Sequence, residues 1–367
     1  MTLGILGGGQ LGRMLALAAA NLGVRVRAYD EAADACAGQV CDLHVGTYDD
    51  DARLDAFAAG CDAITYEFEN VPVSAAQRLA ARAAVCPPPA ALAASQDRLT
   101  EKTLFVELGI DTPAFAPIDA PGDLAAALDR VGLPAVLKTR RGGYDGKGQA
   151  VVRTLADAAH ASEMLDCGRI PLIAEAFVPF TSEVSALLVR GRAGEEAMYP
   201  LCQNRHAGGI LRETLVLPDA PRALVDQATG AATAIAQRLD YVGVLAVEFF
   251  ELNGRLLANE MAPRVHNSGH WTMDGAATSQ FENHVRAVLG LPLGPTAATT
   301  HAAMLNLIGQ HPPLESLLAL PGAKVHLYGK EPRPGRKLGH VNLLASDPAS
   351  LSRHLARARQ LIEPAAQ

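Results

Sequence analysis

Two glutamates near residue 250 stand in otherwise apolar segments. Glu248 lies in VGVLAVEFFEL and Glu260 in RLLANEMAPR, where a carboxylate without a partner is costly to bury. If these segments pair through a two-residue Asn253-Gly254 turn, the acids fall on opposite faces, whereas a three-residue loop or a single bulge puts them on one face. We expect one face, with the irregularity near Gly254, and therefore a Mg²⁺ site completed by phosphate and water. The alternative is two unrelated acids at strand ends.

A glycine-rich loop lies upstream of these acids. Residues 140–149 read RRGGYDGKGQ, and Lys138 stands in the apolar segment before them. Four glycines leave backbone donors free to fold over a triphosphate, and a strand lysine supplies a fixed cation for its phosphates. The loop is not a Walker A sequence, because no Gly-Lys-Ser/Thr ending opens a helix. A plain hairpin tip is the alternative, but it would not need so many charges.

Two further acids follow the loop. Glu175 belongs to LIAEAFV and Glu183 to TSEV. Backbone groups of the first segment could pair with an adenine edge, and nearby carboxylates could accept hydrogen bonds from ribose hydroxyls. Alone this signal is weak, because an acid on an edge strand is usually solvated.

Two polar clusters indicate a second, anionic ligand. Arg264, His266, Asn267, Ser268 and His270 fall within seven residues of EMAPRVHNSGHW. The turn KEPRPGRKLGH, residues 330–340, is the densest cationic cluster in an acidic chain. A surface loop is the alternative for the first cluster and a solvated turn for the second. The sharper interpretation of the second is a clamp for a substrate phosphate.

The glycines near the N-terminus match a dinucleotide-binding pattern. Gly7, Gly9 and Gly12 follow an apolar segment, and Asp30 ends the next one at the expected spacing. Taken alone the pattern suggests NAD. Because the other nucleotide signals lie in the middle of the chain, we expect no dinucleotide here and place Gln10 beside the second substrate instead.

Composition limits the class of protein. A net charge of −7 argues against a nucleic-acid partner. The six cysteines show no zinc or CxxC spacing, which favours free thiols in a reducing compartment. No stretch reaches the ~18–20 apolar residues of a membrane span. We expect a cytoplasmic protein without nucleic-acid or membrane partners.

The order of elements predicts an α/β protein of several domains. A strand, an Ala/Leu-rich helix over about 10–22 and the strand VRVRAY form a βαβ unit with a parallel sheet. Three consecutive prolines near residue 87 and the segment GLPLGPTAATT near residue 293 interrupt the pattern. We therefore expect domains at 1–95, 96–293 and 294–367.

The joint motifs resemble one enzyme family. GGGQLGRM, TYEFENVP, KTRRGGYDGKGQ, YPLCQNRHAGGILRET, EMAPRVHNSGHWT and PGRKLGHVNL are similar, in this order, to the signatures of the 5-(carboxyamino)imidazole ribonucleotide synthases. The resemblance implies an ATP-grasp architecture with a Rossmann-like N-terminal (pre-ATP-grasp) domain, a small C-terminal domain and a homodimer. It also implies a ligase that joins ATP, bicarbonate and aminoimidazole ribonucleotide through carboxyphosphate in purine biosynthesis.

The resemblance assigns roles position by position. It implies ATP contacts at Arg98, Lys138, Gly143, Tyr144, Asp145, Gly146, Lys147, Gly148, Gln149, Glu175, Ala176, Phe177, Val178, Glu183, His206, Asn259 and Glu260. It implies Mg²⁺ ligands at Glu248 and Glu260, and a catalytic role beside bicarbonate for Arg264, with Lys138 on the phosphates. It implies that Tyr144, Asp145, His266, Asn267, Ser268, Lys330 and Arg336 surround the aminoimidazole nucleotide.

One position departs from related biotin-dependent carboxylases, which place an asparagine ligand where this chain has Ala262. A third protein ligand of that kind is therefore in doubt. The rival interpretations are another ATP-grasp ligase, similar to a formate-dependent glycinamide ribonucleotide transformylase, an NAD-dependent oxidoreductase, and a nucleotide sensor without catalysis.

Overall fold

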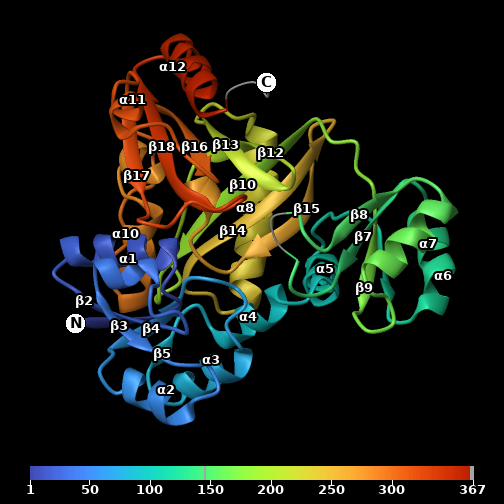
Figure 1. Cartoon of the computed structure of the whole chain (residues 1–367), viewed down its shortest axis with the longest axis horizontal. Coiled ribbons are helices and arrows are strands. Elements are labelled where there is room, and N and C mark those ends of the chain that lie inside the picture. The colour runs from blue at the N-terminus through green and yellow to red at the C-terminus, as the bar shows by residue number, and fades with distance from the viewer. Residues whose placement is uncertain (144–145, 364–367) are drawn as a thin grey trace.

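The N-terminal part is a parallel sheet flanked by helices. The structure, a computed structural model of the chain, describes residues 1–143 and 146–363 (Figure 1). The strand order is β3-β2-β1-β4-β5, with every pair parallel. Its elements are β1 (Thr2–Leu6), α1 (Gln10–Asn21), β2 (Arg25–Asp30), β3 (Asp42–Val45), α2 (Asp51–Ala58), β4 (Ala63–Tyr66), α3 (Val73–Ala80) and β5 (Ala84–Val85).

This arrangement confirms the predicted βαβ unit. All five residues of β1 are buried, as expected for an apolar strand covered on both faces. Gly12 lets α1 pack closely on the preceding turn, because a Cβ there would lie 2.8 Å from the carbonyl oxygen of Gly7. The helix α1 thus starts directly above the end of β1.

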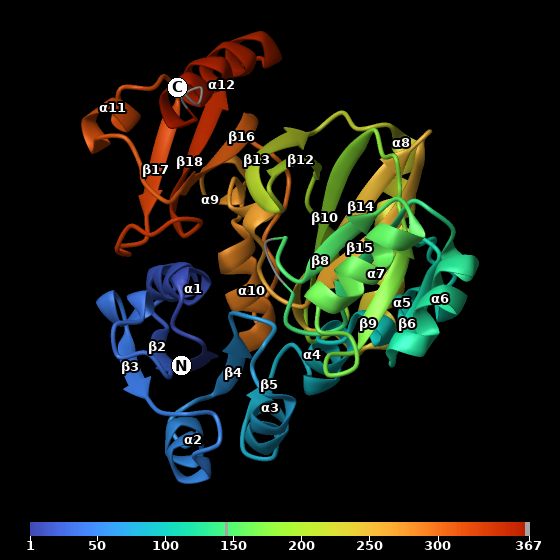
Figure 2. The ribbon, with the colours of Figure 1, turned by 45° about the vertical axis from the view of Figure 1, so that its right-hand side comes forward.

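A small antiparallel sheet follows two connecting helices, α4 (Pro89–Ser95) and α5 (Arg98–Glu107). Its strand order is β6-β9-β7-β8. Helices α6 and α7 cover its outer face and leave the other face toward the rest of the molecule (Figure 1 and Figure 2). Its elements are β6 (Phe115–Ile118), α6 (Leu124–Val131), β7 (Ala135–Thr139), β8 (Gln149–Val152), α7 (Leu155–Met164) and β9 (Leu172–Ala176).

The large sheet has nine strands in the order β15-β14-β10-β12-β13-β16-β18-β17, with β11 paired to β10. The central elements are β10 (Ser182–Arg190), β11 (Glu196–Met198), β12 (Leu201–Ala207), β13 (Ile210–Leu217), α8 (Arg222–Arg238), β14 (Gly243–Leu252), β15 (Arg255–Ala262), α9 (Thr272–Gly275) and α10 (Gln280–Leu289). The last elements are β16 (His301–Ile308), α11 (Leu314–Leu318), β17 (Ala323–Leu327), β18 (Lys337–Ala345) and α12 (Pro348–Ile362).

The C-terminal strands extend this sheet and form no sheet of their own. Strand β13 pairs with β16 across the boundary expected near residue 293, with Glu213 opposite Leu305. Helix α12 packs on β16 and β18. A hydrophobic core that includes Leu305, Leu343 and Leu355 gives this end its own interior.

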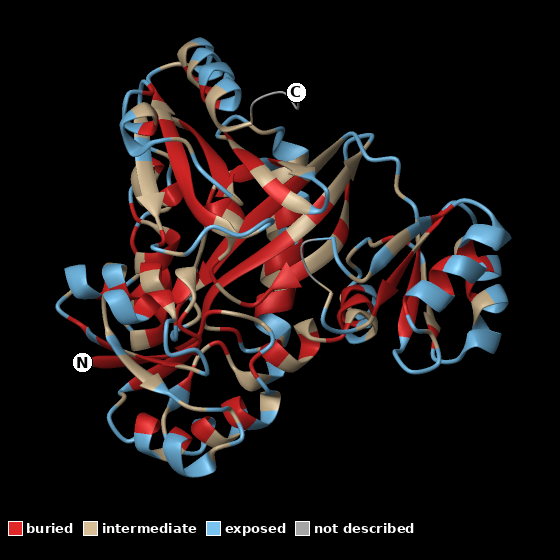
Figure 3. Cartoon of the chain, in the orientation of Figure 1, coloured by how far each residue is buried: buried red, intermediate tan, exposed pale blue. Residues whose placement is uncertain are grey.

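The buried strands form the centre of the molecule, and exposed residues gather on the outer helices (Figure 3). Helix α10 lies between α1 and the large sheet, which joins the N-terminal part to the centre. All six cysteines are free, as predicted. Among the described residues, no helix combines the length and the apolar character needed to cross a bilayer.

Candidate active site

A bulge in the β14–β15 hairpin brings the two glutamates together. The turn is a two-residue Asn253-Gly254 turn, with φ of 53° and 77° and Leu252 opposite Arg255. The register then shifts, so that Phe249 pairs with Ala258 but Glu248 pairs with Glu260. The extra residue is Asn259. The one-face prediction is confirmed, but the predicted position of the irregularity near Gly254 is wrong, because the bulge lies next to the acids.

The two carboxylates behave differently. Burial raises the pKa of Glu248, and the neighbouring charge of Glu260 raises it further. Burial would also raise the pKa of Glu260, but the Arg98 guanidinium outweighs this effect and lowers it. Arg98 Nη1 donates to Glu260 Oε2 at 2.9 Å. The Glu260 side chain is 40% exposed, so the Arg98–Glu260 ion pair is open to solvent on one side.

The pair fits a hard divalent cation. Two like charges on one face are stabilised by a cation between them, and carboxylate oxygens are the donors that Mg²⁺ prefers. Within residues 1–143 and 146–363, no group of three or more His, Cys, Asp or Glu side chains is arranged to hold a metal. A cation here would therefore need phosphate and water oxygens as well. Ala262, buried in the hydrophobic core opposite Ala246, offers no ligand.

A lysine from the small sheet reaches the bulge. Lys138 Nζ donates to Glu175 Oε2 at 3.0 Å and lies 3.4 Å from Asn259 Oδ1. Burial would raise the pKa of Glu175, but Lys102, Lys138 and Arg98 outweigh burial and lower it to about 2. The predicted ATP residues of both sheets thus meet at Asn259.

The expected adenine and ribose contacts lie beside this point. The backbone N–H groups of Ala176 and Phe177 already donate to Ala114 and Pro134, so an adenine edge would pair with the remaining groups of the segment 175–178. His206 Nδ1 lies 2.8 Å from Glu183 Oε2. Burial would lower the pKa of His206, but Glu183 and Glu248 raise it.

The glycine-rich loop is anchored at its base. Arg140 donates from Nε and Nη2 to the Asp97 carboxylate at 3.0 and 2.9 Å, and its carbonyl accepts from Arg98 N at 3.0 Å. Farther along the loop, Gly146 lies close to Gly208, because a Cβ on Gly146 would lie 2.9 Å from the carbonyl oxygen of Gly208. The predicted roles of Tyr144 and Asp145 fall outside the described residues.

The first polar cluster lies next to the acids. His266 Nε2 is 3.4 Å from Glu248 Oε1, and its Nδ1 is 2.8 Å from Ser268 Oγ. The side-chain nitrogen and oxygen of Asn267 are both buried without a partner in the described part of the chain. Arg264 forms an ion pair with Glu69, which follows β4 of the N-terminal sheet. His270 is fully buried, and its Nδ1 lies 3.3 Å from Gln280 Nε2.

The C-terminal cations approach the N-terminal glycines. Lys330 Nζ donates to Gln10 Oε1, so the structure brings together two residues predicted for the second substrate. Burial lowers the pKa of Lys330, and the positive charges of Arg336 and Lys337 add to this effect. Arg336 itself donates to the carbonyl of Glu331 at 3.1 Å.

A carboxylate of the chain fills the glycine turn. Glu67 Oε1 accepts from Gly9 N at 2.9 Å, and Glu67 Oε2 accepts from Gly12 N at 3.0 Å. These are the donors that would hold a pyrophosphate at a helix N-terminus. Asp30, expected at a dinucleotide ribose, instead accepts from Gly8 N at 2.6 Å.

We therefore expect no binding of NADH, because Glu67 occupies the phosphate donors and would repel a pyrophosphate. Titration calorimetry with NADH should show no saturable heat, with ATP and Mg²⁺ as the positive control. Micromolar binding of NADH would contradict this assignment.

Sequence reasoning missed four charged residues that hold the site. Glu67 and Glu69 stand in TYEFENV, which carried the family resemblance but had no assigned role. Asp97 and Lys102 stand in the helical segment that precedes the small sheet. Their partners are far away in the sequence, so charge in an otherwise apolar setting was the only available signal.

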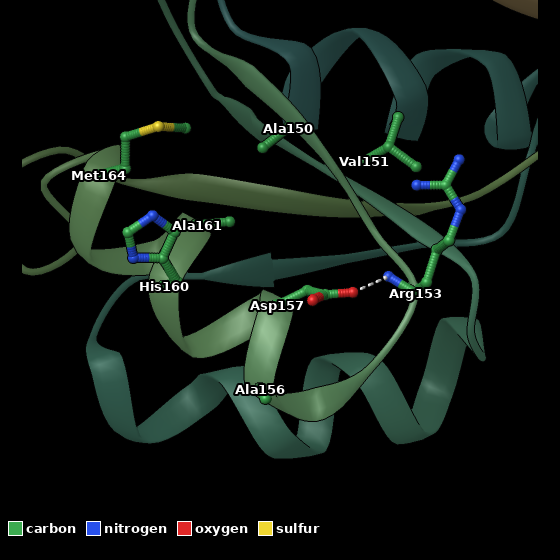
Figure 4. A pocket seen from close by; sticks show the side chains of 8 residues that line it. All are labelled: Ala150, Val151, Arg153, Ala156, Asp157, His160, Ala161 and Met164. Carbon is green, nitrogen blue, oxygen red and sulfur yellow. Dashed lines mark hydrogen bonds between the residues drawn. The ribbon is translucent and has the colours of Figure 1, made fainter.

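A surface cavity of 520 Å³ lies elsewhere, between β8 and α7 of the small sheet (Figure 4). Its polar residues include Arg153 and Asp157, and Arg153 N donates to Asp157 Oδ2 at 3.1 Å. The same Asp157 oxygen accepts from Thr154 N at 3.0 Å in the capping box that starts α7, so we assign the cavity no ligand.

Comparison with known proteins agrees with the geometry. Three family models match in order: the ribonucleotide synthetase preATP-grasp domain over residues 1–96, the ATP-grasp domain over 103–281, and the phosphoribosylaminoimidazole carboxylase C-terminal domain over 302–354. N5-carboxyaminoimidazole ribonucleotide synthase from Pseudomonas aeruginosa is 49% identical over 364 residues, covering 99% of this chain and 100% of the relative.

Solved structures are similar over the whole chain. The N5-carboxyaminoimidazole ribonucleotide synthetase of Thermus thermophilus has a TM-score of 0.95 and 55% identity, covering 100% of this chain and 99% of that one. An enzyme from Aspergillus clavatus, solved with ADP and 5-aminoimidazole ribonucleotide, has a TM-score of 0.90 and 28% identity, covering 99% and 98%. The chain belongs to the N5-carboxyaminoimidazole ribonucleotide synthase family of ATP-grasp ligases.

Proposed function

We propose that the space beside the Asn259 bulge is where this chain uses ATP to carboxylate 5-aminoimidazole ribonucleotide with bicarbonate, yielding N5-carboxyaminoimidazole ribonucleotide, ADP and phosphate for purine biosynthesis. The observation that carries the proposal is the position of Lys138. It joins the small sheet to the bulge that places Glu248 opposite Glu260. The ammonium group that would bind phosphate therefore lies beside the two carboxylates that would bind the metal.

The chemistry requires positioning more than covalent catalysis. Bicarbonate is a poor electrophile, and its phosphorylation by ATP gives carboxyphosphate. The carboxyl group of carboxyphosphate, or the CO₂ that it releases, is then attacked by the exocyclic amine of the nucleotide. Lys138 and Arg98 bind the transferring phosphate, and the loop 140–149 folds over it. Asp97 keeps the base of that loop beside Arg98.

Magnesium is the cation that the acidic pair fits best. Glu248 and Glu260 would hold it, and when bound it neutralises phosphate charge and fixes the phosphate orientation. Arg98 stays paired with Glu260 and so reaches the same phosphates.

Arg264 would bind bicarbonate or carboxyphosphate. Its guanidinium retains donors beyond the pair with Glu69, and an arginine fork matches a planar carboxylate. Because Glu69 follows β4 in the N-terminal part, its ion pair with Arg264 joins the two parts of the molecule.

The aminoimidazole nucleotide would lie between the N- and C-terminal parts. Gln10 and Lys330 hold one side, Arg336 adds charge, and His266, Asn267 and Ser268 face from the centre. The unpartnered amide of Asn267 supports a polar ligand at this point. The resemblance further supports a homodimer in the cytoplasm, which sedimentation and cell fractionation would test.

The decisive assay is phosphate release from ATP. Release should require both 5-aminoimidazole ribonucleotide and bicarbonate. Stimulation by formate with glycinamide ribonucleotide would instead support the transformylase alternative. ATP binding without release under any of these conditions would support a nucleotide sensor.

Truncating Arg336 to alanine should raise the KM for 5-aminoimidazole ribonucleotide by roughly ten- to hundred-fold, as expected for the loss of a hydrogen bond to a charged phosphate. The KM for ATP should barely change, because Lys138 and Arg98 serve that ligand. Steady-state kinetics with each substrate varied in turn would measure both. A selective effect on ATP would remove this turn from the second substrate.

A further inference from the structure

Lys102 on α5 is a fully buried lysine that has no role in the chemistry described above. Its side chain has no solvent exposure. Its Nζ lies 3.0 Å from Thr112 Oγ1, 3.1 Å from the carbonyl oxygen of Ala258 and 3.4 Å from Glu175 Oε2. A buried cation is costly unless it is paired and hydrogen-bonded. This site meets both conditions.

Burial lowers the pKa of Lys102, but its three contacts favour the ammonium form. The Thr112 hydroxyl donates its own hydrogen to Ala258 O at 2.7 Å, so it accepts from Lys102. The carbonyl and the carboxylate oxygens can only accept. Three acceptors therefore face Nζ, whereas a neutral amine has two N–H groups. The geometry therefore fits an ammonium group whose donors all face acceptors inside the protein.

Lys102 shares its carboxylate with Lys138. Glu175 Oε2 accepts from Lys138 at 3.0 Å and also faces Lys102, whereas Glu175 Oε1 is buried without a partner in the described part of the chain. The two lysines and one glutamate carry a net charge of +1. Without Lys102, Glu175 would share its charge with fewer cations, Lys138 and Arg98.

The network also joins the two sheets that flank the site. Glu175 and Lys138 belong to the small sheet, whereas Ala258 precedes the Asn259 bulge in the large sheet. Lys102 stands between them on α5. It therefore fixes the distance between the phosphate lysine and the strand that carries Glu260.

We propose that Lys102 is a positioning residue for ATP: it shares the charge of Glu175, leaves Lys138 able to bind phosphate, and keeps Lys138 beside the Asn259 bulge. The inference rests on the proposed role of Lys138 at the ATP phosphates. No contact of Lys102 with ATP is needed, because it acts through Glu175 and Lys138.

The test is a double-mutant cycle on ATP and ADP affinity, measured by calorimetry with Mg²⁺, together with KM values. Lys102→Met should weaken nucleotide binding by about ten- to hundred-fold, the range for losing the charged hydrogen bond from Lys138 to phosphate. The KM for 5-aminoimidazole ribonucleotide should change by less than about twofold, and the control Lys324→Met, at an exposed lysine of β17, should change neither. The double variant Lys102→Met/Lys138→Met should bind no more weakly than Lys138→Met, since Lys102 acts through Lys138.

The outcomes separate the two hypotheses. Normal nucleotide binding by Lys138→Met would overturn the proposed role of Lys138. Weak binding by Lys138→Met with normal binding by Lys102→Met, or additive losses in the double variant, would overturn the role of Lys102. If Lys102→Met does not fold, Thr112→Val removes one partner of the ammonium and should weaken ATP binding by about two- to tenfold. Unchanged affinity in a folded Thr112→Val protein would contradict the proposal.

Discussion

Replacing Glu260 with glutamine is expected to reduce the maximal rate of phosphate release by about 100- to 1000-fold, on the order of 3–4 kcal/mol of transition-state stabilisation. Glutamine keeps the shape of the side chain but removes one hard anionic ligand opposite Glu248. It also leaves Arg98 without its ionic partner. The phosphate and the metal would both lose their alignment.

Steady-state kinetics at increasing Mg²⁺ would measure this effect, and the variant should need more Mg²⁺ for half-maximal rate. Glu251→Gln is the matched control on the same hairpin, because Glu251 caps the turn at Gly254 N and lies away from the acid pair. Its rate should stay within about twofold. A rate for Glu260→Gln close to that of the unchanged protein at saturating Mg²⁺ and ATP would end the metal assignment.

The hairpin shows what a sequence pattern can and cannot specify. The apolar setting of Glu248 and Glu260 was sufficient to predict that they lie on one face, because an isolated buried charge is unfavourable. The Asn-Gly pair left a two-residue turn and a three-residue loop both open, and the structure has the two-residue turn. The bulge at Asn259 could not be located from sequence, since an extra strand residue is recognised only from the register of its partner.

The N-terminal glycines show a different limit. Their pattern correctly indicated a tight turn between a strand and a helix. The pattern could not show which group accepts hydrogen bonds from that turn. The acceptor is the carboxylate of Glu67, 55 residues beyond Gly12 in the sequence. Only the parallel pairing of β1 with β4 brings this carboxylate to the turn.

The residues around the proposed phosphate site follow the same rule. Lys138 was predicted from the glycine loop that follows it. Lys102 and Asp97 were not, because each belongs to an ordinary charged helix and its role depends on partners in other elements. The C-terminal boundary also needed pairing information, since only β13 beside β16 shows that the large sheet continues past residue 293.

Buried histidines make the stability of the fold depend on pH. His284 on α10 is fully buried between two sheets. Val244 N donates to its Nδ1 at 3.0 Å, so Nε2 carries the proton and donates to Thr65 Oγ1 at 2.8 Å. The neutral ring is therefore satisfied at both nitrogens, and a second ring proton would face the N–H of Val244. Burial lowers the pKa of His284 to about 3.

The sign of the pH effect follows from this lowered pKa. In the unfolded chain His284 takes up a proton below about pH 6.5, whereas in the folded protein it stays neutral until about pH 3. Between these values the unfolded state binds more protons, so the free energy of unfolding falls as the pH falls. Above pH 6.5 the contribution of His284 to the free energy of unfolding is intact. It falls by about 2 kcal/mol at pH 5 and by on the order of 4 kcal/mol near pH 3. Burial lowers the pKa values of His266, His270 and His340 as well, which adds in the same direction.

Substitution of His284 with asparagine should separate the contribution of His284 to the pH dependence of stability from those of the other buried histidines. The side-chain oxygen of asparagine can accept from Val244 N in place of Nδ1, but it does not titrate and does not reach Thr65. The variant should be less stable than the unchanged protein by about 1–3 kcal/mol at pH 7.5, as for a lost buried hydrogen bond. By pH 5 this difference should shrink by about 2 kcal/mol, because only the unchanged protein loses the contribution of a neutral His284. Urea titrations of near-UV circular dichroism at both pH values would measure the difference. Parallel losses of stability in the two proteins would show that protonation of His284 does not govern acid unfolding, and that the interface between β4 and β14 depends on packing alone.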